Sequence, residues 1–211
     1  MKKALKISGM AVGCCLLLAA GSMLAYSRFF PVVPSPPLVT TRGISLNDET
    51  RAKLTEIVFQ AAREDDVQTV DEFLKEGFTP NVRSPRGDTL LTVAAYSGSA
   101  GVVERLLQQA DVEIEARNRM GLTAVSAAAF KGHNEILKLL VAHGADVNAA
   151  NSMHQTPLMF AALSGRTQSV EVLLTAGAKP ETEDSLGNSA LSLARTQGAD
   201  EVVALLSVEG D

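Results

Sequence analysis

Two patterns of hydrophobic and polar residues divide the chain. The stretch from Ile7 to Tyr26 contains no charged residue. From about residue 45 onward, short apolar groups recur at positions three and four residues apart, separated by polar residues and glycines. Apolar positions at that spacing predict short amphipathic helices. The chain therefore consists of one long apolar segment followed by a series of short helices.

The helical groups repeat at a fixed period. Residues 121–148 read GLTAVSAAAFKGHNEILKLLVAHGADVN, and residues 154–181 read HQTPLMFAALSGRTQSVEVLLTAGAKPE, at an offset of 33. Residues 187–211 match at the same offset, and residues 87–115 match with one extra residue. A period of this length is typical of a solenoid built from stacked helical units.

Each repeat carries residues suited to begin and end two helices. A hydroxyl residue precedes the first helix, where its oxygen can accept a hydrogen bond from a free backbone N–H group. Glycines follow both helices, since a left-handed residue lets the chain reverse. Alanine pairs allow close packing in the first helix, and leucine pairs supply buried surface in the second. The hydroxyl residues are Thr89, Thr123, Thr156 and Ser189, and the glycines after the first helices are Gly98, Gly132, Gly165 and Gly198.

These motifs resemble the ankyrin-repeat family, whose pattern includes T-P-L, A-A, G-H, L-L-L and G-A-D-V-N. The resemblance implies an all-α fold, an ankyrin-repeat solenoid of helix-turn-helix units with finger loops. About five repeats are expected, at residues 50–83, 84–117, 118–150, 151–183 and 184–211. The histidine that the family often has after T-P-L is replaced by Thr92, Ser126, Met159 and Ser192, so its hydrogen bonds are missing or remade.

The first repeat is degenerate, and the repeat domain is expected over residues 45–211. Ser45 with Asp48 three residues later predicts a capping box that opens a helix. Leu54, Ile57, Val58 and Ala61 then supply an apolar stripe at helical spacing.

The N-terminal segment predicts a membrane location. About 20 apolar residues in a helix span the hydrocarbon core of a bilayer. Three lysines precede the apolar stretch and one arginine follows it, which places the N-terminus in the cytoplasm. We expect residues 1–28 to be a signal-anchor or signal peptide and residues 29–44 to be a Pro-rich linker. The expected localisation is the inner membrane, single-pass with the domain in the periplasm. The alternative is a soluble periplasmic protein after cleavage before Met23.

Composition argues against catalysis and against nucleic-acid binding. Residues 31–211 carry 15 Lys and Arg against 24 Asp and Glu, a poor balance for a polyanion ligand. Both cysteines, Cys14 and Cys15, lie in the apolar segment. The histidines His133, His143 and His154 have ordinary repeat positions, and no Gly-rich phosphate loop follows a strand. We therefore expect no enzyme activity, no cofactor and no metal site. The acidic residues Glu113, Glu115, Glu181, Glu183 and Asp184 are expected to be solvated loop carboxylates.

The resemblance also indicates where a partner would bind. Ankyrin proteins usually bind partners on the concave face, formed by finger tips and by the ends of the first helices. Many residues that map there are large and apolar, which is typical of a recognition surface. The alternative is that these side chains fold back on neighbouring repeats. The candidate partner-binding residues are Arg86, Tyr96, Arg119, Met120, Leu122, Phe130, Met153, Leu163 and Leu186; Gln155 and Thr196 map to the same face.

The expected function is a non-catalytic adaptor or accessory factor tethered outside the cytoplasm, with a monomeric domain that recognises a protein of unknown identity. The chain is similar to small exported bacterial ankyrin-repeat proteins, some of which resemble accessory factors in oxidative-stress defence. The alternative is an immunity or inhibitor protein that blocks a periplasmic toxin or enzyme.

Overall fold

The computed structural model describes residues 47–208, and within them every regular element is a helix. Five helix pairs follow one another along the chain. The first helices of the pairs are α2 (Asp48–Glu64), α4 (Leu90–Ser97), α6 (Ala124–Lys131), α8 (Pro157–Leu163) and α10 (Ala190–Gln197). The second helices are α3 (Val67–Lys75), α5 (Ala100–Leu107), α7 (Asn134–Ala142), α9 (Thr167–Thr175) and α11 (Asp200–Val208). The all-α expectation is confirmed for this part of the chain.

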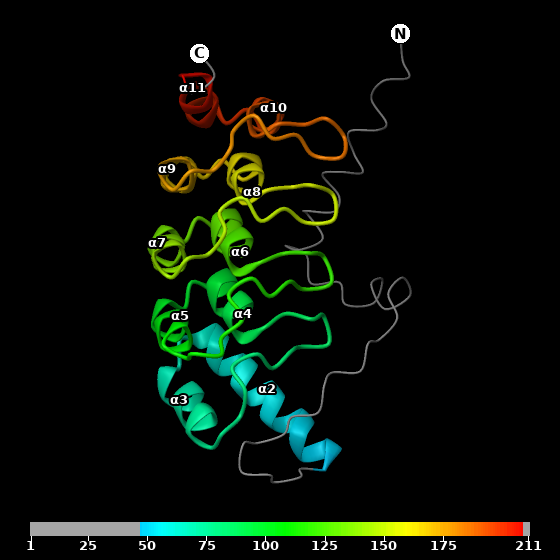
Figure 1. The fold of residues 1–211 in the computed structure, drawn as a ribbon, viewed down its shortest axis with the longest axis vertical. Coiled ribbons are helices and arrows are strands. Elements are labelled where there is room, and N and C mark those ends of the chain that lie inside the picture. Colours follow the sequence, from blue (N-terminus) through cyan, green and yellow to red (C-terminus); the bar gives the residue numbers. More distant parts are fainter. Residues whose placement is uncertain (1–46, 209–211) are drawn as a thin grey trace. The chain divides into compact units, whose positions relative to one another are not determined.

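The helices form two layers. Each first helix packs on the next first helix, each second helix packs on the next second helix, and the two helices of a pair contact each other. Figure 1 shows these layers as two columns, with long finger loops that leave the first-helix layer on the side away from the second helices. We call the first helices the inner layer and the second helices the outer layer.

The predicted helix caps are confirmed. The side chains of Thr89, Thr123, Thr156 and Ser189 accept hydrogen bonds from the backbone N–H three residues ahead. The residues that replace the family's histidine remake its bonds locally. The hydroxyls of Thr89 and Thr92 lie 3.0 Å apart, and those of Thr123 and Ser126 lie 3.2 Å apart. All four residues are buried, so the hydrogen bond within each pair supplies a partner for hydroxyl groups that have lost contact with water.

The glycines at the helix ends adopt the expected left-handed backbone. Gly98 is the C-cap of α4 with φ of 86°, and its N–H donates to the Ala94 carbonyl. A Cβ atom at this position would lie 2.8 Å from the Cε1 atom of His133 in the next repeat. Gly98 is therefore required both by its dihedral angle and by the close approach of its neighbour.

The core runs continuously between the two layers. The alanines at positions 94, 95, 128, 129, 161 and 162 have no measurable exposure, so the first helices approach closely. Leu106, Leu140 and Leu173 of the outer layer are equally buried. Their partners Leu139 and Leu174 are only partly buried and pack against the edge of this core. The predicted close packing of alanines in the first helices and burial of leucines in the second helices are confirmed, although the first helices also bury large side chains such as Leu90 and Leu158.

The first repeat departs from the prediction in two ways. The helix begins at Asp48 and is capped by Asn47, whose side chain accepts from the Thr50 N–H at 2.8 Å. The predicted capping box opened by Ser45 is therefore wrong. The helix has 17 residues against 8 in α4, so its N-terminal half projects beyond the repeat. Ile57 is 55% exposed because α2 is the first helix of the described stack and no helix of that stack covers its outer side.

The membrane prediction needs correction. Among residues 47–208, no helix combines the length and the apolar character that a bilayer crossing requires. This finding contradicts the predicted single-pass localisation in the inner membrane, which we do not retain. The apolar helix expected within residues 1–28 and the linker expected at 29–44 lie outside the described residues.

Candidate functional site

The four finger loops share one hydrogen-bonded turn. A polar side chain five residues before each helix cap accepts from two backbone N–H groups at the loop tip. In the second loop, Asn118 Oδ1 accepts from Met120 at 2.9 Å and from Leu122 at 3.0 Å. The same position is held by Ser84, Asn118, Asn151 and Asp184 in the four loops. Each loop tip is thus held by hydrogen bonds within its own sequence.

Bonds between loops hold the fingers in line. The Arg83 guanidinium donates to the Arg117 carbonyl at 3.0 Å, and Arg117 donates in turn to the Ala150 carbonyl. Asn118 Nδ2 donates to Asp88 at 2.8 Å. Along the tips, the Arg119 N–H donates to the Arg86 carbonyl and the Ser185 N–H donates to the Met153 carbonyl. The fingers therefore behave as one connected edge.

The shared turn sets the register of the tips. Counting back from each cap, the residue at the tip is Arg86, Met120, Met153 or Leu186. The extra residue between Thr89 and Thr123 shifts the second finger by one, so the counterpart of Arg86 is Met120, and Arg119 precedes it. Arg86 is exposed, Met153 is 38% exposed and Leu186 is 60% exposed. Arg119 and Met120 are half-buried.

Leu122 does not lie on this surface. It is 8% exposed and belongs to the position just before the helix cap, where the chain turns under the finger. Asp88, Gln155 and Asn188 hold the same position in the other loops and are half-buried. Leu122 is therefore a structural residue, and its expected exposure on the candidate surface is wrong.

An aromatic and cationic cluster lies at the ends of α4 and α6. The rings of Tyr96 and Phe130 are stacked, with centroids 6.5 Å apart and planes inclined by 14°. The Lys131 ammonium lies 5.0 Å from the Tyr96 centroid, within the range of a cation–π contact. Both rings remain half-buried. The expected alternative, that these side chains fold back on their neighbours, is therefore partly true, since Tyr96 also packs against the core.

The cluster belongs to a row that faces the side of the fingers. Because α4 packs against α2, α5 and α6, its exposed positions lie on the remaining side, which the finger loops border (Figure 1). The equivalent of Tyr96 in the other repeats is Arg63, Phe130, Leu163 or Thr196. We call the combined surface of this row, Lys131 and the finger tips the inner surface: Arg63, Arg86, Tyr96, Arg119, Met120, Phe130, Lys131, Met153, Leu163, Leu186 and Thr196.

The side chains of His133 and Arg166 contact the backbone carbonyls of two residues in this row. His133 Nε2 lies 3.2 Å from the Tyr96 carbonyl oxygen, and Arg166 Nε donates to the Phe130 carbonyl one repeat later. Burial lowers the pKa of His133, against the raising effect of the Tyr96 carbonyl, and the charges of Lys131 and Arg166 lower it further. The neutral imidazole is therefore the form that the folded stack favours.

An outer-layer carboxylate, Asp71, lies between two cations. Asp71 of α3 accepts from Arg105 of α5 at 2.8 Å and pairs with Lys75 at 2.5 Å. The Lys75 ammonium and the Arg105 guanidinium hold the pKa of Asp71 below its usual value.

One of the loop carboxylates that we expected to be solvated is buried. Asp184 is only 7% exposed because it forms the last finger turn, whereas Glu113 is exposed and pairs with Arg83.

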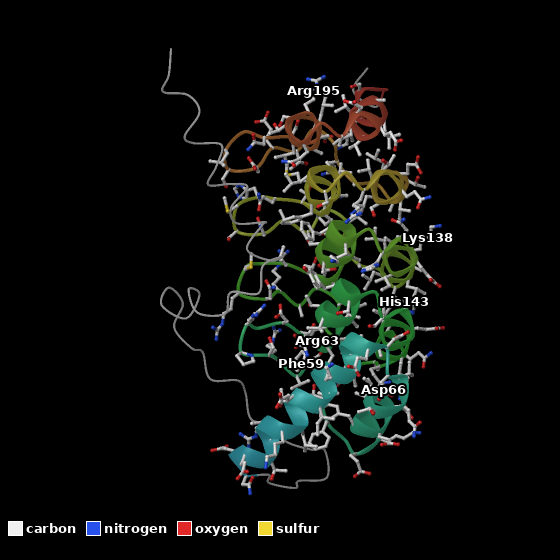
Figure 2. The ribbon with its side chains drawn as sticks, turned by 180° about the vertical axis from the view of Figure 1, so that it is seen from behind. Phe59, Arg63, Asp66, Lys138, His143 and Arg195 are labelled. Atoms are coloured by element: carbon white, nitrogen blue, oxygen red, sulfur yellow. The ribbon has the colours of Figure 1, made fainter. Side chains whose placement is uncertain are left out.

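The three histidines have separate local contacts and do not form a cluster. His143 Nδ1 bonds to the Leu139 carbonyl of its own helix, and His154 adopts a left-handed backbone with φ of 58° at a finger tip. Figure 2 shows His143 on the side opposite the finger loops. In the part of the chain that the structure describes, no group of three His, Cys, Asp or Glu side chains is placed to hold a metal ion.

Comparisons with known proteins agree with this geometry. A family description of three ankyrin repeats matches residues 58–151, and one of a single ankyrin repeat matches residues 153–185. This part of the chain therefore belongs to the ankyrin-repeat family. Family members are generally non-catalytic modules for protein interaction. The inner surface of this ankyrin domain lies where the finger loops and first helices of such repeats meet.

Individual relatives match over only part of their length. Alpha-latrocrustotoxin-Lt1a of Latrodectus tredecimguttatus is 30% identical over 47% of this chain, which is 7% of the toxin. Serine/threonine-protein kinase 12 of Arabidopsis thaliana is 34% identical over 40% of this chain and 18% of the kinase. A putative ankyrin repeat protein of Pseudomonas aeruginosa is 39% identical over 22% of this chain and 27% of that protein. The chain thus spans about a quarter or less of these relatives.

Proposed function

We propose that the ankyrin domain is a non-catalytic binding module that recognises a protein partner through its inner surface. The observation that carries the proposal is the combination of a half-buried row of apolar and aromatic side chains with exposed apolar finger tips on a fixed scaffold. Met153 and Leu186 are among the few large hydrophobic side chains that the described residues leave exposed. Apolar and aromatic residues of this kind dominate the energetics of protein interfaces.

The scaffold strengthens the proposal because contacts within the domain itself hold the surface in place. The finger turns and the bonds between fingers fix the tips, and the Tyr96–Phe130 stack fixes the helix row. A surface that is already ordered loses little conformational entropy on binding, so more of its contact energy appears as affinity.

The proposal is tested by affinity capture with the full chain from extracts of its native cells. The test variant is Phe130→Ala with Leu163→Ala, because both side chains are partly exposed members of the row. The matched control is Lys138→Ala with His143→Ala on the outer layer, both exposed (Figure 2). Circular dichroism is used to check that all variants fold. We expect one protein that the wild type and the control capture and that the test variant captures at least tenfold less. Equal capture by the test variant would contradict the proposal.

The captured partner separates two roles within the same proposal. An accessory factor, such as one acting in oxidative-stress defence, preserves or raises the activity of its partner. An inhibitor of the immunity type abolishes that activity at one-to-one stoichiometry. Assaying the purified partner with and without the ankyrin protein distinguishes them.

A further inference from the structure

The inner surface and the whole chain differ in the sign of their charge. The chain carries a formal net charge of −5. The inner-layer helices α4, α6, α8 and α10 contain no Asp or Glu, although α6 contains Lys131 and α10 contains Arg195. The outer-layer helices contain acidic residues in every repeat. Acidic side chains are therefore absent from the inner-layer helices that follow α2, whereas α2 itself contains four.

Two carboxylates near the finger tips, Asp88 and Asp184, are engaged in hydrogen bonds of the loops, whereas Glu181 and Glu183 of the last loop are exposed. Asp184 accepts four hydrogen bonds within its own loop, from the N–H groups of Leu186 and Asn188 and from the Asn188 amide. Asp88 accepts from Asn118 and from the Ser84 hydroxyl. Neither carboxylate neutralises a cation at the finger tips.

The cations of the inner surface have no carboxylate partner within the described residues. Arg63, Arg86, Arg119 and Lys131 make none of the ion pairs found in residues 47–208, in contrast to Lys75, Arg83 and Arg105. Arg63 donates to the Gln60 amide at 3.4 Å, and Lys131 lies over Tyr96. A group of cations without carboxylate partners produces a locally positive potential that attracts anionic groups.

These cations are confined to one half of the surface. All four come from the first three repeats, whereas the inner surface of the last two repeats consists of Met153, Leu163, Leu186 and Thr196. Apolar side chains partly cover the first half too, through Tyr96 and Phe130. The surface therefore changes from cationic and aromatic to apolar along the stack.

We propose that the inner surface binds an extended protein segment that is acidic in the half lying on the first three repeats and apolar in the half lying on the last two. This inference rests on the proposed function and specifies the chemistry of its partner. Packed helices lie about 9 Å apart, so the five first helices span about 36 Å. An extended segment of about 11 residues covers that length.

A polynucleotide fits this surface less well than an acidic segment. A polynucleotide carries a negative charge on every nucleotide. The net negative charge of the protein therefore repels it at long range. The apolar half of the surface offers such a polyanion no charge to bind. A short segment with a few carboxylates and a few large apolar side chains matches both halves.

The test is selection of random displayed peptides, about 12 residues long to match the estimated span, on the immobilised full chain. We expect selected sequences to be enriched in Asp and Glu in one half and in large apolar residues in the other. The double variant Arg86→Glu with Arg119→Glu should lose the acidic enrichment and weaken the binding of a selected peptide about tenfold in fluorescence anisotropy. The matched control is Lys138→Glu on the outer layer, which should bind that peptide as the wild type does.

The outcomes separate this inference from the proposed function. Selected peptides without acidic enrichment that the Phe130→Ala, Leu163→Ala variant fails to bind would overturn the inference and leave the proposed function standing. Peptides that bind this variant as well as the wild type would overturn both. Failure to recover any enriched sequence, or displacement of the peptide by a single-stranded oligonucleotide at equal concentration, would also overturn the inference.

Discussion

The inner and outer layers of the stack are stabilised in different ways. Inner helices α4, α6, α8 and α10 begin with a hydroxyl cap, and fixed finger turns precede them. The residues before outer helices α5, α7 and α9 make no such cap bond. The outer layer instead buries Leu and Ile side chains against its neighbours. Large side chains are buried in the inner layer too, such as Leu90 and Leu158. The comparison indicates that local polar bonds shape the inner layer and its finger loops, whereas outer helices α5, α7 and α9 rely on burial without such caps.

The largest effect should come from removing outer-layer burial. Leu140→Ala deletes a fully buried side chain of α7, which we expect to cost about 2–5 kcal/mol of unfolding free energy. Urea denaturation followed by circular dichroism measures the loss. The exposed outer-layer substitution Lys138→Ala is the control and should change stability by less than about 0.5 kcal/mol. A loss below about 1 kcal/mol for Leu140→Ala would show that outer-layer burial contributes little to stability.

A pair of glycines compares the layers directly. Gly98→Ala places a Cβ atom 2.8 Å from the His133 ring at φ of 86°, whereas Gly177→Ala after α9 meets nothing within 4 Å at φ of 89°. Both substitutions incur the left-handed penalty of about 1–2 kcal/mol, and only the first adds a steric clash. Thermal unfolding should therefore show a larger decrease in Tm for Gly98→Ala. Equal decreases would mean that the His133 ring moves aside freely.

A finger substitution tests local preorganisation. Asn118→Ala removes the acceptor for two tip N–H groups and the bond to Asp88, which we expect to cost about 1–2 kcal/mol. Asn118→Ser is the matched control, because Ser84 performs the same role in the first finger. Hydrogen exchange at Met120 and Leu122 should accelerate in the alanine variant and much less in the serine variant. Unchanged exchange in both would refute the role assigned to the turn.

The smallest effect concerns pH. The pKa of His133 lies below its ordinary value in the folded protein, so the unfolded chain binds the proton more readily. Its neutral form stabilises the fold above the ordinary histidine pKa of about 6.5, and this contribution decreases as the pH falls through that value. We expect the Tm difference between pH 7.5 and pH 5.5 to be smaller for His133→Gln than for the wild type. An identical difference would exclude His133 as a source of pH dependence.

The sequence predicted most of the architecture and part of the surface. The repeat period, the helix caps and the buried Ala and Leu positions could be predicted because the same residues recur at the same positions of each repeat. The caps Thr89 and Thr123 are an example. The first residue of α2 could not be predicted, because Ser45 and Asn47 are both residue types that cap helices. The exposure of Leu122 was mispredicted, because the sequence alone does not show that the position just before the cap turns under the finger. The polar residues of the finger turns were missed, although their fixed spacing before each cap could have revealed them.

The most direct test of the central claim is site-specific photo-crosslinking in the native cells. A photoreactive phenylalanine analogue replaces Leu186, a finger-tip side chain that is 60% exposed, in one variant of the full chain. It replaces His143 of the outer layer in the other. The account predicts a discrete adduct with one protein from position 186 and none from position 143. No adduct from position 186, or the same adduct from both positions, would contradict binding through the inner surface.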